Sequence, residues 1–155
     1  MPTPDRGPLR YGLGRAVLIS VLCTVLYLAV LVGVWGFVSL LTGIDVVPEP
    51  GIPILAGPIM AAVACIVLLL SVLFSLRRIT GRPPVARAVV AGALVYLIVP
   101  LAGAAVLTLD AADPVAGLLF AAEMATGAFV PAAAIAAAVL VAAVPPVLAL
   151  GDRSR

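Results

Sequence analysis

The sequence predicts an all-α fold, a transmembrane four-helix bundle of up-down topology with both termini in the cytoplasm. The first observation is composition: the 155 residues are 65% hydrophobic and 10% charged, whereas soluble domains average about 45–50% apolar and about 25% charged residues. The second is that the few charges separate four long uncharged stretches, and lipid forces each of these to be helical because backbone groups must pair internally. A single soluble domain of this length could not bury so much apolar surface, which excludes a soluble enzyme, and the net charge of +2 gives no sign of a nucleic-acid partner.

The third observation is the distribution of the basic residues, which predicts the orientation. All nine are arginines, and none lies in the loops that carry Asp45 and Glu49 or Asp110 and Asp113. Cationic loops stay on the cytoplasmic side during insertion. An even number of spans follows, with three groups of arginines inside, namely Arg6, Arg10 and Arg15, then Arg77, Arg78, Arg82 and Arg87, and finally Arg153 and Arg155.

The first half of the chain is predicted to contain a tail, two spans and a proline-rich outer loop. The first hydrophobic stretch is much longer than the roughly 7–15 residues of a signal peptide, so we expect a retained helix. Pro48, Pro50, Gly51 and Pro53 mark the loop that follows it. We assign the cytoplasmic tail to residues 1–15, the first span to 16–42, the outer loop to 43–54 and the second span to 55–76.

The second half begins with a basic loop and ends with a stretch too long for one span. Residues 115–150 would form a helix of about 54 Å, whereas the hydrocarbon core is about 30 Å thick. We therefore expect a short interfacial helix before the last span, and an end to that span at Pro145-Pro146. We assign the basic loop to residues 77–87, the third span to 88–109, the outer turn and interfacial helix to 110–121, the fourth span to 122–144 and a cytoplasmic tail to 145–155.

Glu123 is the one acidic residue that could lie within a span. Acidic side chains inside a membrane are costly and often carry protons. However, Glu123 precedes Pro145 by a distance of about 33 Å along a helix, which would place it at the outer interface. An ordinary interfacial glutamate and a functional carboxylate both remain open.

The arginines of the middle loop, Arg77, Arg78, Arg82 and Arg87, are candidate contacts for anionic lipids. Each basic residue near a membrane surface contributes about 1 kcal/mol of attraction to anionic headgroups. The alternative is that they serve only as the topology signal.

Other polar residues within the spans suggest packing rather than chemistry. Ser20 and Thr24 are one helical turn apart and are expected to bond to carbonyls of their own helix. Tyr27 and Tyr96 lie deep, and the carbonyl freed by Pro100 is a candidate partner for their hydroxyls. Cys23 and Cys65 are expected to lie at different depths as unreactive core residues. The chain contains no histidine and no lysine, and we expect no catalytic residue, metal ion or cofactor.

The layout resembles a group of small four-span inner-membrane proteins of unknown function that are common in high-GC Gram-positive bacteria. The resemblance rests on the arginine-rich tail, the Trp35-Gly36-Phe37 run in the first span, the acidic outer loop, the arginine loop and the alanine-rich last span. It implies the bacterial cytoplasmic membrane as the location. Small multidrug exporters also have four spans, but they need a glutamate in the first helix, which this chain lacks; polysaccharide flippase helpers match by size.

The expected function is non-enzymatic. The alanines of the last span favour close helix packing, either at the centre of the bundle or against another subunit, although a GC-rich genome would also enrich alanine. The leading hypothesis is packing against other membrane proteins or a second copy of the chain, in the lipid bilayer and without nucleic acid. The second is a small oligomeric transporter or channel subunit that uses Glu123.

Overall fold

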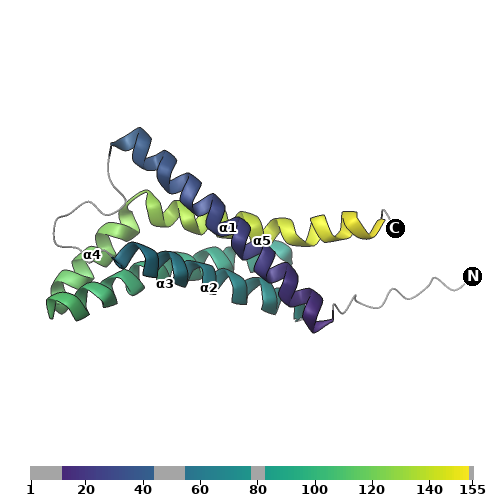
Figure 1. Cartoon of the computed structure of the whole chain (residues 1–155), viewed down its shortest axis with the longest axis horizontal. Helices are drawn as coiled ribbons and strands as arrows, with labels where there is room; N and C mark the ends of the chain where they lie inside the picture. The colour runs from purple at the N-terminus through teal and green to yellow at the C-terminus, as the bar shows by residue number, and fades with distance from the viewer. Residues whose placement is uncertain (1–11, 44–54, 78–82, 154–155) are drawn as a thin grey trace, which may run out of the picture.

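The computed structural model describes residues 12–43, 55–77 and 83–153, which form five helices and no strand (Figure 1). The helices are α1 (Leu13–Thr42), α2 (Ala56–Arg77), α3 (Pro84–Ala111), α4 (Pro114–Thr126) and α5 (Phe129–Arg153). Three of them, α1, α2 and α3, are long and apolar enough to cross a membrane. If the bent pair of α4 and α5 is counted as one span, the number rises to four. The all-α class is confirmed, and the long apolar helices are consistent with a multi-pass membrane protein.

Helix α3 is the centre of the bundle. It packs against α2, α4 and α5, whereas α1 contacts only α2 and α5 within the described ranges. Ala88, Ala91, Val95 and Val99 form the buried stripe of α3, at spacings of three and four residues that keep them on one face. A matching stripe on α2, in which every fourth residue is buried, consists of Ala56, Met60, Ala64, Leu68 and Val72.

Small residues allow α3 and α5 to approach closely. A Cβ atom added to Gly92 of α3 would lie 3.0 Å from the carbonyl oxygen of Ala134 and 3.2 Å from the Cβ of Ala138. Ala133, Ala134 and Ala137 of α5 are buried. Much of the alanine-rich surface of the last span therefore packs inside the chain, which favours the central role over the oligomer-facing one.

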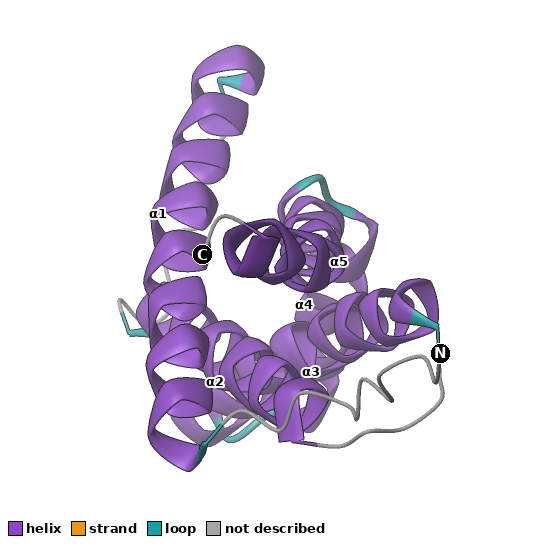
Figure 2. Cartoon of the chain, turned by 90° about the vertical axis from the view of Figure 1, so that its right-hand side faces the viewer, coloured by secondary structure: helices purple, strands orange, loops and turns teal. Residues whose placement is uncertain are grey.

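Helix α1 is peripheral: it packs on the bundle up to Leu31, and its later turns diverge from the bundle. Its buried residues are Ala16, Ser20, Tyr27 and Leu31, and no described side chain beyond Leu31 is buried. Figure 2 shows that the later turns of α1 diverge from the other helices. Gly43 ends the helix in a left-handed conformation with a φ of 66°, and its N–H donates to the carbonyl of Ser39.

Several expected boundaries in the second half differ from the structure, and two of them involve proline pairs. Helix α3 begins at Pro84 rather than at residue 88, because Pro83 is extended and Pro84 is tolerated at the first helical position. Pro145-Pro146 does not end the last helix, which continues to Arg153. Each proline of the pair removes one N–H donor from the helix, so the carbonyls of Val141 and Ala142 lose their helical partners although the helix continues.

The connection between α3 and α4 is short, and the two helices are in contact. Asp113 caps α4, where its carboxylate accepts hydrogen bonds from the backbone N–H groups of Val115 and Ala116. Most of the tail 1–15 and of the outer loop 43–54 lies outside the described residues, as do Arg78 and Arg82 of the basic loop.

Candidate functional site at the broken fourth span

The chain bends by 58° between α4 and α5, at a short break in an apolar pair of helices. Gly127 at the break is extended, with φ −69° and ψ 170°. Pro131 explains the position of the break, because it has no N–H to donate to the carbonyl of Gly127 and its ring would clash with that carbonyl in a continuous helix. Helix α4, at the position where the sequence predicts an interfacial helix, therefore extends to Thr126, five residues beyond the expected end at residue 121.

Hydroxyl groups donate additional hydrogen bonds to backbone carbonyls next to the break. The Tyr96 hydroxyl of α3 donates to the carbonyl of Ala125 over 3.0 Å. The Thr126 hydroxyl donates to the carbonyls of Ala122 and Glu123, each over 3.1 Å. The N–H of Gly127 also donates to the Glu123 carbonyl. Side-chain hydrogen bonds thus stabilise the break, because in an apolar environment backbone groups must find their partners within the chain.

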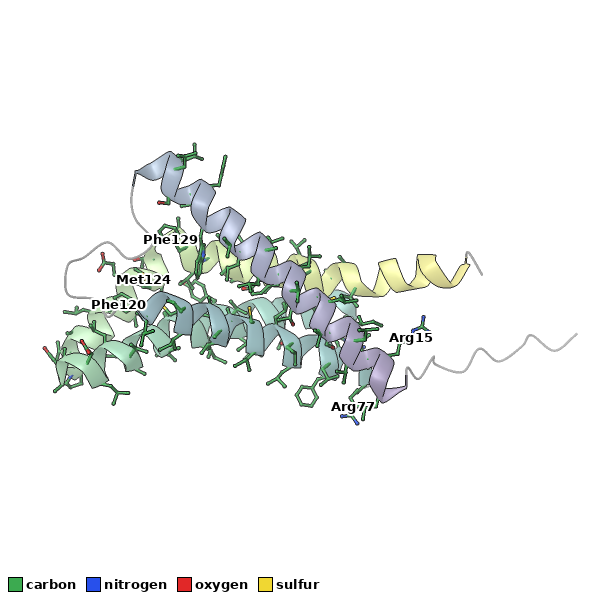
Figure 3. The ribbon with its side chains drawn as sticks, viewed as in Figure 1. Arg15, Arg77, Phe120, Met124 and Phe129 are labelled. Atoms are coloured by element: carbon green, nitrogen blue, oxygen red, sulfur yellow. The ribbon has the colours of Figure 1, made fainter. Side chains whose placement is uncertain are left out.

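Helix α1 binds the beginning of α5 through two aromatic residues. The Tyr27 hydroxyl, fully buried, donates to the carbonyl of Ala133 over 3.1 Å. The Trp35 indole N–H donates to the carbonyl of Phe129 over 3.2 Å, and the two rings pack edge to face with centroids 6.4 Å apart. Figure 3 shows Phe129 where α5 begins, with Phe120 and Met124 on the adjoining α4. Aromatic side chains of α1 and α3 therefore donate hydrogen bonds to backbone carbonyls on both sides of the break between α4 and α5.

The partners of both tyrosines differ from the expected one. Neither hydroxyl bonds the carbonyl near Pro100; both bond carbonyls of α4 or α5. Sequence spacing gave no signal for these pairs, because Tyr27 and Ala133 are separated by 106 residues. The expected bonds within one helix are confirmed for Ser20 and Thr24, whose hydroxyls donate to the carbonyls of Ala16 and Ser20.

Glu123 lies in the last turn of α4, one turn before the break, and its side chain is exposed. The structure brings its backbone, rather than its carboxylate, into the hydrogen bonds of the break. Among the residues that the structure describes, no group of three or more His, Cys, Asp or Glu side chains could hold a metal ion. Cys23 and Cys65 are free thiols, each partly buried against the core.

Arginines of the basic loop occupy different positions at one end of the bundle. Arg77 is exposed at the end of α2, and Figure 3 shows it near the same end as Arg15. Arg87 lies in the first turn of α3 and is half-buried, and its Nη1 donates to the carbonyl of Ser75 over 3.3 Å. The structure therefore separates Arg87, which is packed between two helices, from Arg77, which is not.

These observations define an all-α protein with three helices long and apolar enough to cross a membrane, and a bent pair, α4 and α5, that passes the same test when the two helices are taken together. The chain belongs to a family of unknown function, DUF6121, whose model matches residues 10–155. No curated protein and no solved structure matches the chain.

Proposed function

We propose that this is a non-enzymatic, multi-pass protein of the bacterial cytoplasmic membrane. It binds other membrane proteins, or a second copy of itself, through the exposed face of α1 that contains Ala29, Gly33 and Gly36. The observation that carries the proposal is an uncovered face of small residues. Ala29, Gly33 and Gly36 are exposed, and no atom of another described helix lies within 4 Å of a Cβ atom added to either glycine.

The position of this face on α1 supports the proposal. Ala29 follows Tyr27 by two residues and precedes Leu31 by two, which places it on the opposite side of the helix from the buried contacts. Small residues at spacings of three and four allow a second helix to approach closely, and such packing drives association where lipid supplies no hydrophobic force. Gly92, Gly103 and Gly117 each face a neighbouring helix within the bundle, so close contact at glycine is how this chain packs its helices.

The orientation is part of the proposal. The beginning of α1 and the end of α5 lie towards the same side of the molecule (Figure 1), and Arg15 and Arg77 lie at this end (Figure 3). An even number of crossings with the arginines in the cytoplasm accounts for this arrangement when α4 and α5 cross as one span. The diverging part of α1 then lies in the outer half of the bilayer.

Site-specific photo-crosslinking in intact membranes tests the partner face. A photoreactive residue at Phe37, which is 61% exposed and one turn from Gly33, is expected to give a protein adduct of defined mass. Gly33→Leu is expected to reduce that adduct at least fivefold, because the larger side chain blocks the close approach of a second helix, while its Cβ atom has open space at this position.

Two controls accompany this experiment. Ala105→Leu enlarges an exposed residue of α3 and is expected to leave the Phe37 adduct unchanged. A photoreactive residue at Leu101, 57% exposed on α3, is expected to give lipid adducts only. Lipid adducts alone at Phe37, or a protein adduct that survives Gly33→Leu, would contradict the proposal.

The second candidate function is a small oligomeric transporter or channel subunit, and the broken span favours it. Interrupted membrane helices form substrate and ion sites in many transporters, because their ends expose backbone groups. Glu123 is the acidic residue nearest the break among the described residues. Its exposed carboxylate would serve as the proton carrier.

Flux measurements with purified protein in sealed vesicles test this candidate. Glu123→Gln is expected to reduce proton-coupled flux at least tenfold if the carboxylate carries the proton. Asp110→Asn, which neutralises an exposed acid at the end of α3, is the matched control and is expected to retain flux. Flux that is absent from the unaltered protein, or that Glu123→Gln leaves unchanged, rejects the transporter.

A further inference from the structure

A groove of about 650 Å³ lies between α2 and α3, towards the end of the bundle where α2 ends and α3 begins. Most of its lining is apolar and comes from both helices. Its polar side chains are Ser71, Ser75 and Arg87. The apolar lining includes Val67, Leu70 and Phe74 of α2 and Val90, Leu94 and Ile98 of α3. The groove therefore combines an apolar lining with one cationic side chain, that of Arg87.

Arg87 is held at the polar end of this groove. Its side chain is half-buried, and its Nη1 donates to the carbonyl of Ser75 across the two helices. A guanidinium group presents its N–H donors in a planar fork that matches the oxygen atoms of a phosphate. The hydrogen bond to the Ser75 carbonyl thus orients the Arg87 guanidinium, a group suited to binding phosphate, at the end of the apolar groove.

The length of the groove corresponds to one leaflet of a bilayer. Arg87 and Ile98 are eleven residues apart on α3, which is about 16 Å along a helix. Half of a hydrocarbon core about 30 Å thick is about 15 Å. A molecule with its charge at Arg87 and its tail at Ile98 would therefore extend from the headgroup region to the middle of the membrane.

The chemistry of the lining indicates the kind of occupant. Its apolar side chains from both helices suit an extended hydrocarbon chain, and the single guanidinium at one end selects for an anionic headgroup.

We propose that this groove binds one anionic phospholipid, taken from the leaflet on the side of Arg87. The phosphate accepts hydrogen bonds from the Arg87 guanidinium, and an acyl chain follows the apolar lining towards Ile98. The site is separate from the α1 face, so the two proposals can fail independently.

Native mass spectrometry of the full chain, released from bilayers of equal parts phosphatidylglycerol and phosphatidylcholine, tests the headgroup contact. The unaltered protein is expected to retain one phosphatidylglycerol. Arg87→Gln is expected to reduce its retention about tenfold. Arg77→Gln removes the same charge from an exposed position at the same end of the bundle, outside the groove lining, and is expected to retain the lipid.

A second pair of variants tests the acyl-chain contact and does not alter charge. Val90→Trp fills the groove from a half-exposed position and is expected to displace the lipid. Val89→Trp adds the same ring one residue away on another face of α3, and is expected to leave the lipid bound. Inorganic phosphate in millimolar excess is expected not to compete, because it lacks the chain.

Three results would overturn the proposal. They are equal retention by the two arginine variants, equal retention by the two tryptophan variants, or retention of phosphatidylcholine as strong as that of phosphatidylglycerol. Circular dichroism of each variant confirms its helical content, and the tryptophan pair still decides the question if Arg87→Gln does not fold.

Discussion

Replacing Gly117 of α4 by alanine is expected to lower the free energy of unfolding by about 2 kcal/mol, within the usual cost of overpacking. The added Cβ would lie 2.8 Å from the carbonyl oxygen of Ala104 and would also meet the Thr108 hydroxyl. A backbone carbonyl cannot move without displacing α3, so α3 and α4 must separate. The unfolding midpoint in a titration with sodium dodecyl sulfate measures the effect. Trp35, the chain's only tryptophan, reports by fluorescence whether α1 remains packed on Phe129.

Two other glycine substitutions provide the comparison. Gly33→Ala is expected to be neutral or slightly stabilising, because nothing lies within 4 Å of its added Cβ and alanine favours a helix. Gly103→Ala is expected to be intermediate, since its Cβ would meet the movable ends of Phe120 and Met60. Equal effects at Gly117 and Gly33 would show that α3 and α4 are not in close contact. Thr108→Ala added to Gly117→Ala should restore only part of the loss, because the Ala104 carbonyl remains in place.

Replacing Tyr27 by alanine is expected to cost about 3–5 kcal/mol, the range for removing a large aromatic side chain from a core. Its ring is fully buried in the core cluster between α1 and α5, and its hydroxyl bonds the carbonyl of Ala133. Its removal leaves a cavity and takes away the hydrogen bond from its hydroxyl to the Ala133 carbonyl. The same fluorescence titration measures the change.

Tyr27→Phe separates the two contributions. It keeps the ring and removes only the hydroxyl, and hydrogen bonds between membrane helices average about 0.6 kcal/mol. We therefore expect a loss below about 1.5 kcal/mol, and a similar or smaller loss for Tyr96→Phe, whose ring is 37% exposed. A phenylalanine variant as unstable as the alanine variant would mean that the hydrogen bond, rather than packing, holds α1 to α5.

The candidate site shows how far the sequence could lead. The sequence indicated Glu123 and the middle-loop arginines as candidate functional residues, because charged residues are rare in so apolar a chain. The structure then distinguishes among the arginines, since Arg87 is packed in a groove between α2 and α3 while Arg77 is exposed. Linear order cannot make this distinction, because the groove exists only where two helices meet.

The break in the last span was predictable in kind but not in place. A stretch of residues 115–150 is too long to cross the membrane straight, which required an interruption somewhere. The sequence predicts the interruption near residue 121 and the end of the span at Pro145-Pro146, whereas α5 continues through this pair. The interruption lies instead at Gly127, where Pro131, Tyr96 and Thr126 together remove or satisfy backbone groups.

The all-α class and the approximate positions of the apolar helices followed from the sequence alone, because lipid requires internally bonded backbone and few charges. Which sides of those helices meet was decided only by the tertiary structure. A helix that is apolar on every face has no amphipathic stripe to mark its buried side. The contacts are instead selected by shape and by single hydrogen bonds, as between Gly117 and Ala104 or Tyr27 and Ala133, which join residues from separate helices.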